Sequence, residues 1–396
     1  MEEIVRLDKR EEFRMRRRKK KMQFLLILCV VLLVVLIIML IIAKQMGTMK
    51  SYQVTSEVEL PSGLADYAFG EDMLFLCSND GSKAISENGE TKWEISYHLD
   101  YPVIEYCEDV AAVADIGGTT VYIVAANGIP YNYRVVYPIV KHAVAKQGVT
   151  AVLLNNGAED YIQLYDINGT LRVDINTKTK TDGIPVDIAL SPDGKKLVTL
   201  YMTFEGSEMV GKVTFYNAGE VGKNYNGNIV GQKTFENNKL VYDIGFLNDE
   251  TVYVLYEDGF CIYRMHEVPE LILEQITENE VLDVAVTENG MDMVEKTPAG
   301  TKHLFYYPTD KGIFSRERVW SHLPEYETMY ATEDEVVFLG MQSVTVYRAN
   351  HSLKYEGNFK SSPEAVFPLG GNRYFLLEPG SVRVIKLTKK KQEEGE

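Results

Sequence analysis

The sequence predicts an all-β fold, a β-propeller, preceded by one N-terminal transmembrane helix. Three observations predict it. One long apolar segment stands near the N-terminus. Beyond it, the chain is a series of short β-branched and aromatic runs separated by Gly, Asn and Asp at turn positions. These runs group into units whose lengths fit four-stranded propeller blades.

The chain of 396 residues therefore divides into five expected segments. They are a basic cytoplasmic tail (1–22), a transmembrane helix (23–43), a linker (44–56), a β-propeller (57–388) and a charged tail (389–396).

The apolar segment Gln23–Ala43 has the length and composition of a membrane span. It contains no charged residue, and at about 1.5 Å per residue it covers the roughly 30 Å of a bilayer's hydrocarbon core. Seven Lys or Arg residues lie between Arg14 and Lys21, whereas only Lys44 and Lys50 follow closely. This bias places the N-terminus in the cytoplasm and the propeller outside the plasma membrane of a single-pass protein.

Other roles for this region fit less well. A cleaved signal peptide would have a shorter apolar region, of about 7–15 residues, and a small-residue cleavage site. Cys29 is preceded by Leu28 and followed by more apolar sequence, so it does not fit a lipid-modified cysteine. The basic run can also bind anionic lipids, although topology alone accounts for it.

Charge and cysteine content restrict the partners and the chemistry of the remaining chain. Residues 23–396 carry 31 Lys and Arg against 52 Asp and Glu, a formal charge of −21. This excludes nucleic acid as a partner and favours basic or neutral ones. Three cysteines lie beyond the span, Cys77, Cys107 and Cys261, so either one disulfide with a free thiol or three buried thiols fit. Buried thiols are favoured for Cys77 and Cys261, which lie in predicted strands.

The repeated unit is a short apolar strand, a tight turn, a second apolar strand and then more polar sequence. The units begin near Leu64, Pro102, Ile139, Ile184, Val241, Val281, Thr328 and Glu364. The 332 residues from Glu57 to Thr388 give about 41 per blade for eight blades and about 47 for seven, so eight is favoured and seven also fits. The last unit has room for three strands, and the spare segment SYQVTSEVEL would complete it and close the ring.

Two segments resemble known propeller blades. The sequence VDIALSPDGKKLVTLY, at Val186–Tyr201, resembles the strand–turn–strand of TolB-like bacterial propellers, and AISENGETKWEIS resembles the end of a quinoprotein-type blade. The whole arrangement is similar to an uncharacterised bacterial family of single-span membrane proteins with a propeller outside the membrane. This resemblance implies the fold and topology and says nothing about chemistry.

Motifs for catalysis or cofactor binding are absent from the sequence. There is no G-x-S-x-G, H-E-x-x-H or G-x-x-x-x-G-K-[ST] motif, and the six histidines lack metal-ligand spacing. Trp93 and Trp320 are the only tryptophans, which disfavours a quinone because quinoprotein repeats are tryptophan-rich. We therefore expect no cofactor, no metal and no catalytic residue, and the sequence leans against an enzyme.

An aspartate recurs in the predicted innermost strand of several blades. The four are Asp66, Asp187, Asp243 and Asp283. One interpretation is that each accepts hydrogen bonds from nearby backbone N–H groups, and this is the favoured one. The other is a ring of charge at the mouth of the channel, suited to a cation or a basic peptide.

The longest unit contains an extra loop, AGEVGKNYNGN, which presents Lys223 and Tyr225. Long loops on rigid scaffolds often carry recognition residues, so these two are further candidates for binding. A plain connection between strands is the favoured alternative.

The function that fits best is a membrane-anchored module that binds another protein of the cell envelope. The alternative is an envelope propeller that binds or acts on carbohydrate, and sequence alone cannot supply the carboxylate spacing of a glycosidase. A sensor is a third interpretation, but 22 cytoplasmic residues would need a separate signalling partner.

Overall fold

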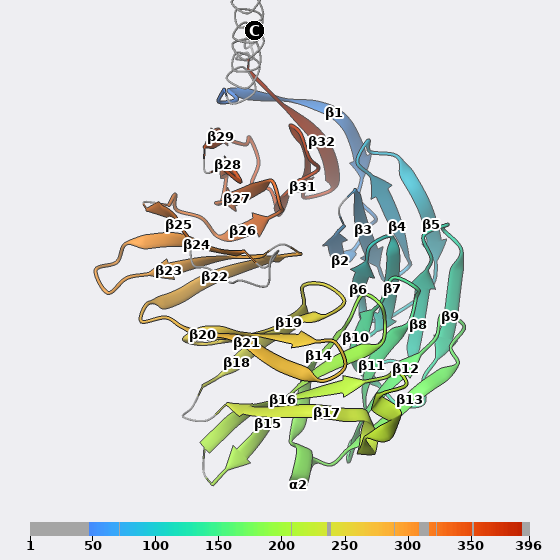
Figure 1. Cartoon of the computed structure of the whole chain (residues 1–396). Helices are drawn as coiled ribbons and strands as arrows, with labels where there is room; N and C mark the ends of the chain where they lie inside the picture. The colour runs from blue at the N-terminus through green and yellow to red at the C-terminus, as the bar shows by residue number, and fades with distance from the viewer. Residues whose placement is uncertain are drawn as a thin grey trace, which may run out of the picture. The chain divides into compact units, whose positions relative to one another are not determined.

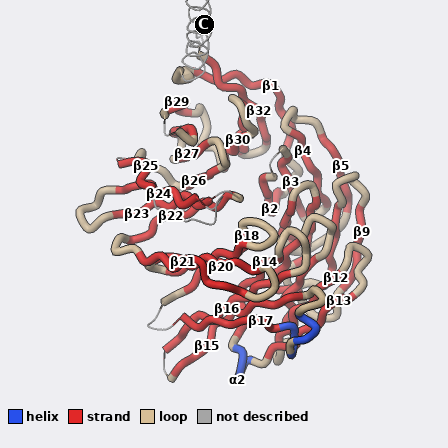
Figure 2. The backbone as a smooth tube through the Cα atoms, viewed as in Figure 1, coloured by secondary structure: helices blue, strands red, loops and turns tan. Residues whose placement is uncertain are grey.

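Alternating apolar and polar residues, interrupted by turn residues, fold this chain into antiparallel strands with almost no helix (Figure 2). The computed structural model describes residues 47–389, apart from residues 71, 207, 236–238, 289, 309–316, 322 and 351. The strands form eight four-stranded sheets, which confirms the all-β, eight-bladed propeller (Figure 1).

Blades 1 to 4 each run from an innermost strand to an outermost one. Their strands are β2 (Leu64–Phe69), β3 (Met73–Ser78), β4 (Gly81–Ser86), β5 (Thr91–Ser96), β6 (Pro102–Cys107), β7 (Val110–Asp115), β8 (Thr120–Val124), β9 (Pro130–Arg134), β10 (Ile139–Val144), β11 (Thr150–Asn155), β12 (Asp160–Tyr165), β13 (Leu171–Thr177), β14 (Ile184–Leu190), β15 (Lys196–Glu205), β16 (Glu208–Asn217) and β17 (Ile229–Phe235).

Blades 5 to 8 follow the same plan, with β1 added as the outermost strand of blade 8. Their strands are β18 (Val241–Phe246), β19 (Thr251–Tyr256), β20 (Gly259–Met265), β21 (Pro269–Ile276), β22 (Glu280–Thr287), β23 (Gly290–Lys296), β24 (Lys302–Pro308), β25 (Glu317–Ser321), β26 (Thr328–Ala331), β27 (Glu335–Leu339), β28 (Ser343–Arg348), β29 (Leu353–Asn358), β30 (Ala365–Pro368), β31 (Arg373–Glu378), β32 (Ser381–Thr388) and β1 (Ser51–Glu59). The short helices are α2 (Thr179–Asp182), η1 (Gly222–Asn224) and η2 (Asn226–Asn228).

The expected unit starts agree closely with the innermost strands. Six of the eight coincide, and the other two differ by one residue because β22 begins at Glu280 and β30 at Ala365. The spare N-terminal segment pairs as expected. Because its strand β1 begins at Ser51, strand structure extends into the segment 44–56 that we expected to be a linker.

Each blade buries apolar side chains against its neighbours. Between blades 4 and 5, for example, Phe215 packs in one cluster with Val254 and Tyr263. The ring closes where blade 8 meets blade 1, since Phe69 of β2 lies in one cluster with Phe375 of β31 and stacks on Phe367 of β30 at 4.5 Å between ring centroids. The core is therefore divided among the seams between blades, and the innermost strands line the centre.

The strand β1 is antiparallel to β32, with Ser51 opposite Thr388 and Glu59 opposite Ser381. Arg383 of β32 strengthens this pairing, because its guanidinium contacts Glu57 of β1 at 3.0 Å and Glu378 of β31 at 2.6 Å. The two ends of the propeller thus lie together, as the sequence predicted.

The seam between blades 7 and 8 contains a buried ion pair. Lys354 of β29 and Glu335 of β27 are both less than a tenth exposed, and the Lys354 ammonium contacts the Glu335 carboxylate and the carbonyl of Gly371. The hydroxyl of Tyr374, on β31 in blade 8, donates to the same carboxylate. This network holds two blades together through charges that water does not reach.

Within the described residues, no helix is both long enough and apolar enough to cross a membrane. The predicted span at 23–43 lies outside them.

Replacing Lys354 with Met should destabilise the propeller by about 3–5 kcal/mol, because the Glu335 carboxylate would stay buried without its cation. Adding Glu335→Gln should recover part of that loss. The matched control is Lys296→Met, which removes an exposed pair with Glu280 and should cost less than about 1 kcal/mol. Urea unfolding of the full-length protein in detergent measures all three variants, and equal losses for K354M and K296M would contradict the role of the buried pair.

Candidate functional site

The innermost strands of blades 1, 3, 4, 5 and 6 share one irregularity. In each, the register with the second strand shifts by one residue, directly before a charged residue. A β-bulge of this kind leaves one residue unpaired and redirects the side chains beside it. The charged residues at this position are Asp66, Lys141, Asp187, Asp243 and Asp283.

Two of these aspartates tie adjacent blades together. The Asp66 carboxylate accepts the N–H of Tyr67 at 2.9 Å and, across the seam, the N–H of Ile104 in blade 2 at 3.0 Å. Asp283 likewise accepts the N–H of Val284 at 2.9 Å; burial raises the pKa of its carboxyl, and the backbone N–H groups of Val284 and of Met329 in blade 7 oppose that rise. For Asp66 and Asp283, these contacts support the interpretation that the carboxylates satisfy backbone N–H groups.

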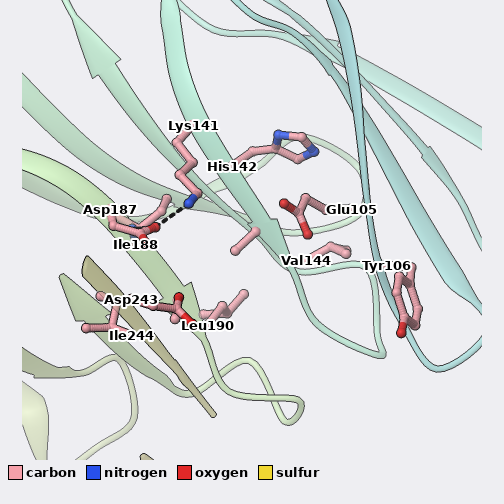
Figure 3. A pocket seen from close by; sticks show the side chains of 12 residues that line it. Glu105, Tyr106, Lys141, His142, Val144, Asp187, Ile188, Leu190, Asp243 and Ile244 are labelled. Atoms are coloured by element: carbon pink, nitrogen blue, oxygen red, sulfur yellow. Dashed lines mark hydrogen bonds and ion pairs between the residues drawn. The ribbon is translucent and has the colours of Figure 1, made fainter. Parts of the chain in front are cut away.

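Asp187 has a different partner. One of its carboxylate oxygens accepts the N–H of Ile188 at 2.7 Å and lies 2.5 Å from the ammonium of Lys141, on the innermost strand of blade 3 (Figure 3). The Lys141 side chain is 40% exposed, so the pair is open to the channel. Asp187 and Lys141 therefore form a charged pair that solvent or a ligand can reach.

A cleft of about 270 Å³ lies at this place, lined by the innermost strands of blades 2 to 5. Glu105 of β6 enters it from blade 2, and Lys141, Asp187 and Asp243 enter from the other three blades (Figure 3). The small side chains of Ala143 and Ala189 line the same space and leave it open. The cleft thus gathers three carboxylates and one ammonium.

Burial shifts the acidity of two of these carboxylates. It raises the pKa of Glu105 to about 7, an effect that Lys141 opposes and that Asp66 and Asp187 increase. It also raises the pKa of Asp243 to about 6, with a further contribution from repulsion by Asp187. A bound cation would lower both pKa values and would be held more tightly as the carboxylates ionise.

The usual nucleophiles of acyl transfer are missing from the described lining of the cleft. Its described lining residues include no Ser, Thr or Cys, and its one histidine, His142, is buried with Nε2 at 3.2 Å from the carbonyl of Ala112. Burial lowers the pKa of His142 to about 4, so the ring is neutral at physiological pH. No group of side chains suited to hold a metal occurs in the described part of the chain. With three carboxylates and one ammonium, the cleft is suited to binding an organic cation such as a basic side chain.

The other two predicted residues lie elsewhere. Lys223 and Tyr225 belong to the connection from β16 to β17, in the outer half of blade 4, whereas Asp187 is on that blade's innermost strand. Lys223 pairs with Glu220 at 2.5 Å, and Tyr225 is 43% exposed. The structure therefore does not bring this loop together with the recurring aspartates.

The three cysteines of the propeller, Cys77, Cys107 and Cys261, are all free, so the alternative with one disulfide is wrong, and the alternative of three buried thiols is right for two of them. Cys77 and Cys261 are buried, as expected, and Cys107 is half-buried.

We expect Asp66→Ala to destabilise the propeller by about 1–3 kcal/mol, because it leaves the buried N–H of Ile104 without its acceptor. Asp283→Ala should have a similar effect. Asp243→Asn should cause no loss, since burial already disfavours the charge of that carboxylate. Thermal melts of the purified full-length variants test this order, and a D66A protein as stable as the original would contradict the interblade role.

The stability of the protein should depend on Glu105 in a pH-dependent way. An unfolded Glu titrates near pH 4.3, so a pKa of about 7 in the folded state means that the folded protein binds this proton more tightly. The contribution of Glu105 to stability is therefore complete near pH 4 and is lost as the pH rises through 7. Glu105→Gln should raise the unfolding free energy at pH 8 by on the order of 3 kcal/mol and leave it unchanged near pH 4.

The matched control for this test is Glu94→Gln, on the exposed face of the outermost strand β5. Urea unfolding at pH 4, 6 and 8 provides the comparison. A stability difference for E105Q that is constant across this range would contradict the raised pKa.

Comparison with known proteins bears on the family of the chain. No curated protein matches the chain. The chain is similar to the β-propeller domain of Cps50 (Swd1) from Myceliophteria thermophila, at 12% identity and a TM-score of 0.49, over 85% of this chain and 100% of that domain. It is also similar to the WD40 domain of SCAP from fission yeast, at 9% identity and a TM-score of 0.49, over 86% and 99% of the two chains. These likenesses concern the blade architecture alone. A family model, described as a family of unknown function (DUF5711), matches residues 45–387, and the chain therefore belongs to the DUF5711 family.

Proposed function

We propose that this protein is a membrane-anchored β-propeller that lies outside the cytoplasm and binds another protein of the cell envelope. The observation that carries the proposal is the open cleft at the centre of blades 2 to 5. Four separate blades contribute a charged side chain to it, and its described lining residues include no Ser, Thr or Cys. Such a site is built for recognition, since rigid strands hold every charged group in place.

Membrane anchoring rests on the sequence. The apolar segment 23–43 has the length of a span, and the basic residues before it favour a cytoplasmic N-terminus. Only residues 44–50 separate this segment from β1, which begins at Ser51. The anchor would therefore hold the propeller close to the outer surface of the plasma membrane.

The charge of the chain favours a basic or neutral partner. Residues 23–396 carry a formal charge of −21, and the cleft adds three carboxylates against one lysine. Complementary charge accelerates encounter and selects among partners more than it adds to affinity. An envelope protein with a basic surface fits these requirements.

A second candidate function is binding or hydrolysis of envelope carbohydrate. The observation that favours it is Glu105, whose pKa of about 7 suits a general acid, next to Tyr106 in the lining of the cleft. Release of reducing sugar from cell-wall glycan by the original protein, and its loss in Glu105→Gln, would support this candidate over the protein-binding one.

The test of the leading proposal is crosslinking in cells that express the full-length protein, followed by affinity purification and mass spectrometry. A control protein carries residues 1–50 fused to an unrelated soluble domain, so that it retains the predicted anchor and lacks the propeller. We expect a partner recovered in stoichiometric amount with the full-length protein only. Recovery of the same proteins with the control would contradict a propeller-dependent interaction.

A further inference from the structure

Exposed apolar side chains directly precede the charged residues of four innermost strands. The residue at each bulge, directly before the charged residue, is apolar or aromatic in blades 3 to 6 and remains between 39% and 48% exposed. These residues are Val140, Val186, Tyr242 and Leu282. Because the bulge leaves them outside the regular ladder, they are not packed into the seams between blades.

The hairpin between β15 and β16 adds to this apolar surface. Its two strands are ten residues long. The innermost strand β14 begins at Ile184, opposite Met202 of β15, whereas β15 and β16 stay paired beyond that point, as far as Glu205 and Glu208. The hairpin therefore extends past the start of the innermost strand. Phe204 and Met209, near the tip, are 67% and 51% exposed. Together with the four bulge residues they form what we call the apolar rim.

The apolar rim lies on one face of the propeller. Neighbouring strands of a blade are antiparallel, so the second strand ends where the innermost strand begins. The start of the innermost strand and the turn between the second and third strands therefore lie on the same face of the propeller. The bulges lie near these starts, and the β15–β16 tip is one of these turns. We call this side the inner-start face.

The preceding chain joins the propeller on the opposite face. Ser51 of β1 pairs with Thr388, at one end of the blade 8 sheet. The innermost strand of that blade begins at Ala365, which pairs with Leu377 at the other end of the sheet. Ser51 and the inner-start face therefore lie at opposite ends of the blade 8 sheet. An exposed apolar surface in that position calls for a protein partner.

The charges inside the rim specify what that partner presents. Lys141 is the only Lys or Arg among the described residues that line the cleft, and it is already paired with Asp187. Glu105 and Asp243 have no basic side chain within ion-pair distance in the described structure. A basic side chain placed between them would bring the cleft to two cations against three carboxylates.

Building on the proposed function, we infer that the inner-start face docks a segment of a partner protein in which a lysine or arginine is flanked by apolar side chains. The basic side chain enters the cleft between Glu105 and Asp243, and the flanking side chains pack on the apolar rim. A lipid surface fits less well, because the acidic body repels anionic headgroups and the rim lies opposite the point where the chain enters.

Photo-crosslinking in the full-length protein in cells tests this inference. Two variants each carry one benzoylphenylalanine. In the first it replaces Phe204, on the inner-start face, and in the second it replaces Tyr225, an exposed aromatic residue of the same blade on the opposite face. We expect adducts from position 204 and not from position 225, and sequencing of the crosslinked peptide should find Lys or Arg with apolar neighbours. In the position-204 protein, Glu105→Gln with Asp243→Asn should lower the adduct yield about tenfold, the effect of losing one charged hydrogen bond.

The control for charge is Glu94→Gln with Glu220→Gln, which removes two exposed carboxylates away from the cleft and should leave the yield unchanged. Adducts to lipid, adducts from position 225 alone, or a yield insensitive to E105Q/D243N would each overturn the inferred surface. If a partner is still recovered by the propeller-dependent crosslinking described above, the protein-binding function stands and only its location is wrong. If no partner is recovered by either method, both fail.

Discussion

The pairing of β1 with β32 is the constraint on which the rest of this structure depends. Without β1, the strand from Ser381 to Thr388 would be an open edge, and blade 8 would have three strands. Arg383 links β1, β32 and β31 through two carboxylates, so the first and last parts of the propeller are held by charge as well as by the ladder. When the ring is closed, Phe69 of blade 1 packs in one apolar cluster with residues of blade 8.

The charged residue that follows each bulge has one of two roles, support of a seam between blades or a place in the cleft. Where the carboxylate reaches a backbone N–H of the next blade, as at Asp66, it supports the seam. Where it does not, as at Asp243, it remains in the cleft with a raised pKa. Gly245 shows how closely this region is fitted, because a Cβ there would clash with the ring of Tyr253, which lies against Asp243. The same repeated feature thus stabilises one side of the ring and leaves the other side available for binding.

Much of the fold was predictable because it depends on local patterns. Strand and turn signals located six innermost strands to the residue, and the composition of SYQVTSEVEL identified the closing strand. The cleft was only partly predictable. A search for aspartate missed Lys141, although a search for any charged residue at the same place in the unit would have found it. Glu105 had no such signal, since β6 lacks the bulge, and only the packing of four blades brings it beside the others. Distances across the channel are set by ring closure, which no local pattern encodes.

The strand β1 closes the ring and so fixes both the cleft and the face on which the chain enters the propeller. Hydrogen exchange of the full-length protein in detergent, read by mass spectrometry of peptides, tests it most directly. The account predicts that peptides covering Ser51–Glu59 are protected to the same degree as those of β32, and that both open together. Rapid exchange of residues 51–59 beside a protected β32 would show that β1 does not close the propeller.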